Sequence, residues 1–225
     1  MGVIVTYSVT IANNSGAPQN VAIFVATGLN QAFSLVWLSQ TINDGGNHQF
    51  KWNEKAFGLG WGTTAQPIDI GGQFNSGHPP AVVEPYSAGG KNTLPVKYDN
   101  QSFMFGDTYY KNDLYNALVI STDTSFTVAQ SLTMSVALYV DLFPALAIQG
   151  TPNTLYYFDL TQVRYFLTVT NLTSGAVLPN MIMQASFYAT SSLAATMTTP
   201  VMLVFSPGVT NLQYELGGNL IFSKK

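Results

Sequence analysis

The sequence predicts an all-β chain, folded as an antiparallel β-sandwich of two packed sheets, either immunoglobulin-like or jelly-roll-like. Apolar and polar residues alternate with a period of two along much of the chain, and β-branched and aromatic residues are concentrated in these stretches. Turn-forming Gly, Asn, Asp and Pro interrupt the alternation about every ten residues. No stretch combines the spacing and the caps of an amphipathic helix. We therefore expect a single β domain over residues 1–225.

The first strand is predicted at the amino terminus, where side chains of one face alternate with small or polar residues. The residues of that face are Val3, Val5, Tyr7, Val9 and Ile11. Turn residues at 13–16 separate this strand from a second at 21–25, and residues 44–46 separate strands at 35–38 and 48–52. Because these turns contain residues that accept a positive φ, two β-hairpins are predicted. Later strands are expected at residues 101–105, 117–121, 126–140, 163–170, 181–188, 201–205 and 212–222.

The composition changes to Gly and Pro between about residues 56 and 95, which predicts a long irregular loop excursion from the β domain. Trp52 precedes this stretch, and Trp61 and Tyr86 lie within it. The simpler interpretation is that these three side chains close one end of the sandwich. The alternative is an aromatic platform that binds a sugar or another subunit.

Charge and cysteine content exclude several classes of function. Only 8% of the residues are charged and the net charge is −3, so there is no basic surface for nucleic acid. The absence of cysteine excludes disulfides and thiolate metal sites. His48 and His78 lack the spacing of a metal site, and the loop with Asp107 and Asp113 lacks the ligand spacing of an EF-hand. We expect no enzyme, no catalytic residues, no metal and no cofactor.

Two long uncharged regions, residues 1–43 and 165–214, favour self-assembly. Edge strands are ordinarily protected from further pairing by charged side chains, above all by lysine. The first strand, from Val3 to Ile11, is long and lacks this protection, so it is the candidate assembly strand. The main hypothesis is a non-catalytic structural protein that forms a homopolymer, either a filament or an ordered inclusion, with itself as its partner.

Two other functions start from the same uncharged surface. Residues 124–140 show the uncharged alternation that a membrane-inserting hairpin of a β-pore-forming protein needs, although no second strand of matching length is evident after residue 140. A carbohydrate-binding module that uses the tryptophan-bearing loop is the other alternative. A membrane or a glycan is expected as a partner only under these alternatives. The amino terminus has no signal-peptide pattern, which predicts a protein that is cytoplasmic or released without a classical signal.

Several short segments, in their order along the chain, resemble the bacterial RhiA-type protein family. The segments are Ser34–Gln40, Phe50–Trp52, Tyr98–Phe105, Tyr156–Phe158 and Val204–Val209, followed by Leu212, Tyr214 and Leu216. Members of that family are abundant bacterial proteins induced in the rhizosphere or at high cell density, without an established enzymatic activity. The resemblance implies a highly expressed bacterial β protein and supplies no catalytic residue.

Overall fold

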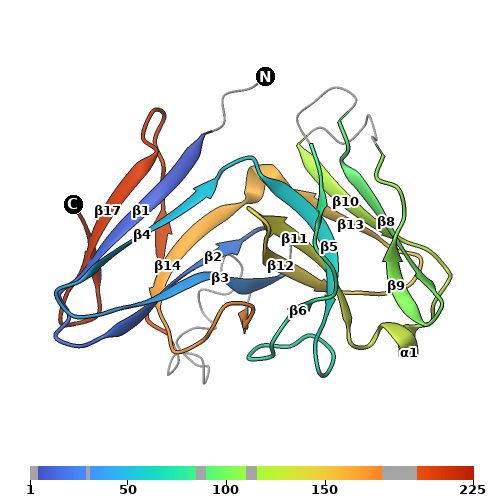
Figure 1. Cartoon of the computed structure of the whole chain (residues 1–225), viewed down its shortest axis with the longest axis horizontal. Coiled ribbons are helices and arrows are strands. Elements are labelled where there is room, and N and C mark those ends of the chain that lie inside the picture. The colour runs from blue at the N-terminus through green and yellow to red at the C-terminus, as the bar shows by residue number, and fades with distance from the viewer. Residues whose placement is uncertain (1–4, 29–30, 85–89, 110–115, 179–196) are drawn as a thin grey trace.

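The computed structural model describes residues 5–28, 31–84, 90–109, 116–178 and 197–225. The described chain is nearly all β, with mostly antiparallel pairing, as predicted. It contains three sheets where two were expected. Figure 1 shows two four-stranded sheets at opposite ends of the molecule, with the strands of a ten-stranded sheet between them.

Sheet I joins strands from both ends of the chain, and sheet II comes from its middle. Sheet I has the order β18-β17-β1-β4 and contains β1 (Thr6–Asn13), β4 (Asn47–Asn53), β17 (Asn211–Leu216) and β18 (Phe222–Lys224). Sheet II has the order β13-β10-β8-β9 and contains β8 (Thr93–Asp99), β9 (Ser102–Phe105), β10 (Ala117–Thr122) and β13 (Leu155–Asp159).

Sheet III is the ten-stranded sheet. Its strands are β2 (Gln19–Ala26), β3 (Phe33–Ile42), β5 (Phe57–Thr63), β6 (Asn75–Ser76), β7 (Ala81–Val82), β11 (Met134–Val140), β12 (Phe143–Gln149), β14 (Arg164–Val169), β15 (Val177–Leu178) and β16 (Val201–Leu203). Its main order is β16-β14-β2-β3-β12-β11-β5-β6, with β15 on β3 and β7 on β5. The predicted strand at 181–188 lies outside the described residues.

The two predicted turns are present, but the predicted hairpins are wrong. β1 pairs with β4 and β17, whereas β2 pairs with β3 and β14, so each turn carries the chain from one sheet to another. Gly16 and Gly45 have φ values of 86° and 71°, as the turn chemistry predicts. The turns also bond to each other: Gly45 N donates to Asn13 O (2.7 Å), and Gly16 N donates to Asp44 Oδ1 (2.8 Å). These contacts favour the crossing between sheets over local hairpin pairing.

The predicted irregular excursion contains a strand, β5, which lies inside sheet III between β11 and β6. Gly58, Gly60 and Gly62 alternate along it, so one face of the strand carries no side chain. A Cβ atom at Gly60 would lie 2.8 Å from the ring of Tyr139. The glycines therefore mark close packing against a strand, and the prediction of an irregular loop is wrong for residues 57–63.

The predicted strand at 126–140 is divided into a helical turn, α1 (Val128–Ser131), and β11. Thr127 begins the helix with a capping box, because its Oγ1 accepts from Gln130 N and the Gln130 side chain accepts from Thr127 N. β12 follows β11 across a two-residue turn, Asp141–Leu142, with positive φ at both residues. A second strand of matching length is thus present, and the hairpin lies inside sheet III, where every residue of β11 is buried.

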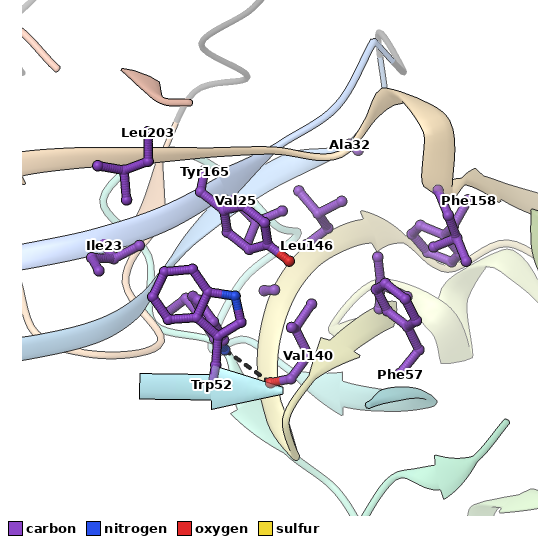
Figure 2. Packing of buried hydrophobic residues seen from close by; sticks show 14 of the residues in the cluster. Ile23, Val25, Ala32, Trp52, Phe57, Val140, Leu146, Phe158, Tyr165 and Leu203 are labelled. Carbon is purple, nitrogen blue, oxygen red and sulfur yellow. Dashed lines mark hydrogen bonds between the residues drawn. The ribbon is translucent and has the colours of Figure 1, made fainter. Parts of the chain in front are cut away.

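Side chains of all three sheets meet in one hydrophobic core (Figure 2). Trp52 of sheet I packs edge-on against Trp37 of sheet III, with ring centroids 5.3 Å apart. The Trp37 Nε1 donates to Val140 O at 3.0 Å, which ties β3 to the end of β11. Phe158 of sheet II belongs to the same cluster. Burial of these large rings is the main favourable term in holding the three sheets together.

Two buried tyrosines, Tyr139 and Tyr214, and the half-buried Tyr7 predict how the stability of the fold changes at alkaline pH. Burial raises the pKa of Tyr7, Tyr139 and Tyr214 above the ordinary value of 10.0, and the carboxylate of Glu54 raises that of Tyr7 further. The unfolded chain releases these protons near pH 10, whereas the folded chain retains them. Their contribution to stability is therefore complete below pH 10 and is lost as the pH rises through the raised folded values.

We accordingly expect the free energy of unfolding to begin to fall at about pH 10, in parallel with the phenolate absorbance of the tyrosines. Chemical denaturation at a series of pH values, followed by tryptophan fluorescence, measures this change. A free energy of unfolding that stays constant to about pH 12 would show that these phenols titrate as in the unfolded chain.

Candidate assembly interface

The predicted assembly strand is an inner strand of sheet I over the described residues 6–13. Val9 lies opposite Phe50 in β4 and Leu212 in β17, so both edges of β1 are paired. Val9 and Ile11 are fully buried, and Val5 and Tyr7 are partly buried. Val3 lies outside the described residues. The expectation of a free edge is therefore wrong for residues 6–13, because uncharged alternation does not distinguish an inner strand from an edge strand.

The two predicted platform aromatics that the structure describes, Trp52 and Trp61, do not come together. Trp52 is 1% exposed and lies in the core beside Trp37. Trp61 is half-buried on β5 and packs against Phe103, with ring centroids 5.7 Å apart. Tyr86 lies outside the described residues. The two indoles thus belong to separate aromatic groups, and Trp52 has no surface to offer a ligand.

Sheet II has two open edges, formed by β9 and β13. In the described part of the chain, β9 pairs only with β8, and β13 pairs only with β10. β9 carries no charged residue, and β13 carries one, Asp159, at its end. Neither strand has the lysine that commonly prevents the addition of another strand. These two edges are the candidate assembly interface.

The hydrogen-bond pattern identifies the backbone groups of β9 that face the open edge. β8 and β9 are joined by the two-residue turn Asn100–Gln101, so Ser102 and Met104 bond to β8. Tyr98 lies opposite Phe103, and its N–H points away from β9 and donates to Ser125 Oγ (2.7 Å). By the same alternation, the N–H and C=O groups of Phe103 and of residue 105 face outward.

Two backbone hydrogen bonds just beyond the ends of β13 show which of its residues bond to β10. Thr122 N donates to Thr154 O at 2.9 Å, and Leu160 N donates to Asn116 O at 3.0 Å. Tyr156 and residue 158 therefore bond to β10, whereas the backbone groups of residues 155, 157 and 159 face the open edge.

Both edge strands have apolar side chains on both faces. Phe103, Phe105, Tyr156 and Phe158 belong to or pack against the core. On the opposite face, three apolar side chains are exposed, namely Met104 (43%), Leu155 (48%) and Tyr157 (40%). Exposed apolar side chains beside unpaired strand edges are typical of surfaces that contact another protein.

A hollow of about 550 Å³ runs along β9 and leaves space beside its open edge. Residues of the strand form one side of this hollow, and Trp61 and His78 form the other. The His78 ring packs edge-on against Phe105, with ring centroids 5.4 Å apart.

A family model described as RhiA matches residues 5–208. The chain belongs to the RhiA family. The predicted resemblance is thereby confirmed, and the RhiA match includes both edge strands of sheet II and ends before β17. No curated protein and no solved structure matches the chain significantly. Among the described residues of this RhiA-family chain, no helix is long and apolar enough to span a membrane.

Proposed function

We propose that this RhiA-family protein is a non-catalytic structural protein that assembles into a homopolymer through the open edges of sheet II. The observation that carries the proposal is that, over the described residues, one sheet has an unprotected edge on each side. A copy can be added at each edge, so the contact is head-to-tail. Head-to-tail contacts generate a filament when the rotation between copies does not close a ring, and this is the assembly that we propose.

Strand directions determine how the two edges meet. β13 is antiparallel to β10, β10 is parallel to β8, and β8 is antiparallel to β9, so β9 and β13 run in the same direction. Copies related head-to-tail would therefore pair β9 with β13 in parallel. In a parallel ladder, an outward-facing residue bonds to the two residues that flank its neighbour. This rule allows Phe103 to lie beside Tyr156 and Phe105 beside Phe158 of the next copy, which is the register we propose because it pairs both outward-facing residues of β9 within β13.

In this register, side chains on the same face of the two strands lie beside each other. The core-facing side chains of one strand lie beside core-facing side chains of the other, and exposed Met104 lies beside exposed Tyr157. A four-residue strand supplies few hydrogen bonds, and a stable interface usually buries more than about 1,000 Å². We therefore expect each contact to be weak, so that polymer length rises with protein concentration.

The proposal also includes a sandwich-like packing in which sheets I and II cover one face of sheet III. The meeting of all three sheets in one core supports this arrangement. The core-facing sides of β9 and β13 are then covered by the core of the same molecule. Their strand edges and outer faces stay available for contact with the next copy.

The proposal is tested by light scattering and negative-stain electron microscopy of the purified protein over a series of concentrations. Filaments with a regular repeat, which lengthen as concentration rises, are the expected result. A monodisperse monomer at every concentration would exclude assembly. A dimer that does not grow further would exclude the head-to-tail contact, because it indicates a closed twofold interface.

A further inference from the structure

A second, smaller hollow of about 280 Å³ lies away from the edges of sheet II, where the end of β4 meets the beginning of β14. Its lining includes one cationic side chain, Arg164, and one anionic side chain, Glu54. Tyr7, Tyr165 and Phe205 supply aromatic walls. The proposed assembly function does not use this hollow.

Arg164, the only arginine of the chain, is held in place by the backbone of the preceding turn. Its Nη1 donates to Thr161 O at 2.9 Å and to Val163 O at 2.8 Å. These two bonds fix the plane of the guanidinium group. Within the described residues, its Nε and Nη2 donate to no protein acceptor, so a fork of two donors remains for a ligand.

Glu54 lies on the same hollow without forming an ion pair with Arg164 in the described structure. Its backbone N donates to Val5 O at 3.1 Å, and its carboxylate lies near enough to Tyr7 to raise the pKa of that phenol. An ionised carboxylate accepts several hydrogen bonds. A cation and an anion therefore line one hollow.

The walls of the hollow are flat and apolar. The rings of Tyr7 and Phe205 stack with their centroids 4.1 Å apart and an interplanar angle of 7°. Trp52 packs edge-on against both rings, with centroids 6.1 Å from Tyr7 and 5.8 Å from Phe205. Its centroid lies 5.1 Å from that of Tyr165. Figure 2 shows Trp52 and Tyr165 near each other in the core. The Trp52 Nε1 is buried and finds no hydrogen-bond acceptor among the described residues, an arrangement that costs stability. The aromatic group thus includes an unsatisfied donor next to the charged hollow.

We infer that this hollow binds a small zwitterion of the α-amino acid class. The ligand carboxylate pairs with the free fork of Arg164, its ammonium group pairs with Glu54, and its side chain lies against Tyr7 and Phe205. Pockets for drug-sized ligands have volumes of about 300–1,000 Å³, so a hollow of about 280 Å³ suits a free amino acid better than an oligosaccharide.

The test is calorimetric titration of the full chain with three probes that share the branched side chain of leucine. L-Leucine carries both charges, 4-methylpentanoate lacks the amine, and 3-methylbutylamine lacks the carboxylate. Because a hydrogen bond to a charged group contributes about 1.5–3 kcal/mol, we expect each single-charge probe to bind about tenfold or more weakly than leucine. L-Serine and L-phenylalanine are titrated alongside to vary the side chain.

Variants that remove one charge each test which residue binds the carboxylate of the ligand and which binds its ammonium group. We expect Arg164→Gln and Glu54→Gln each to weaken amino acid binding about tenfold, with Arg164→Gln leaving the affinity for 3-methylbutylamine unchanged. Lys51→Gln removes an exposed charge from β4 outside the hollow and serves as the matched control. The inference is overturned if none of the three amino acids binds, if leucine and 4-methylpentanoate bind equally, or if both variants keep the original affinity.

Discussion

Met104→Lys abolishes the homopolymer and leaves a folded monomer, if the open edges of sheet II mediate assembly. Met104 is 43% exposed on the outer face of β9, so a lysine fits there without entering the core. In the proposed register its charge would lie beside Tyr157 of the next copy, where an apolar contact is expected. Light scattering at a concentration at which the wild type forms filaments measures the loss, and thermal unfolding checks the fold.

A matched control separates this effect from a general effect of charge. Val128→Lys adds the same charge at a residue of α1 that is 60% exposed and lies on no edge strand. We expect this variant to form filaments as the wild type does, with stability changed by less than about 0.5 kcal/mol. Equal loss of assembly in both variants would show that solubility, rather than strand pairing, had changed.

Mixing two blocked variants tests the head-to-tail geometry itself. Met104→Lys keeps an intact β13, and Tyr157→Lys keeps an intact β9. Neither variant forms filaments alone, but one contact between them remains possible, so a mixture yields a dimer that cannot grow. Sedimentation velocity of the separate and mixed variants measures this dimer. A Tyr157→Lys variant that dimerises by itself would favour a twofold β9 contact instead.

Gly62→Ala is expected to lower the free energy of unfolding by about 1–3 kcal/mol, which is the usual cost of overpacking. A Cβ atom at Gly62 would lie 2.3 Å from the ring of Phe74 and 2.4 Å from Asn75 O. The carbonyl is backbone and cannot turn away, so β6 must shift. For a chain of this size the loss corresponds to roughly 2–12 °C in melting temperature, measured by calorimetry.

Gly217→Ala is the matched control for the clash at Gly62. The nearest atom to a Cβ at Gly217 is Asn219 Oδ1 at 3.4 Å, an ordinary contact. We expect a change of less than about 0.5 kcal/mol. An unchanged melting temperature for Gly62→Ala would show that β6 is not packed on β5 as the structure describes.

The local alternation of side chains predicts the strands much better than it predicts their partners. The strand that contains Val9 and the turn that contains Gly16 are where the sequence places them. The partner of Ser8, in contrast, is Asn211, which is 203 positions away. Alternation with a period of two predicts which side chains of a strand face the core. Which other strand it pairs with depends on packing across the whole molecule.

The two edge strands of sheet II lie outside the long uncharged regions, residues 1–43 and 165–214, on which the predicted assembly strand rests. β9 and β13 are short, but each contains consecutive apolar residues, Phe103–Phe105 and Leu155–Phe158. Such runs make both faces of a strand apolar, which is typical either of a fully buried strand or of one that contacts another chain. This signal could have identified both strands, although the sequence alone does not tell which face is exposed.

The pairing of β1 with β17 has a consequence for the order of folding. During synthesis β1 is made long before β17, so one of its edges has no partner until nearly all of this chain has emerged. Long-range pairing of this kind is slow, because loop closure must precede any gain from the contact. An uncharged strand that waits in this way is open to association with other nascent chains. The strand that is protected in the folded protein is thus the one at risk while the protein is being made.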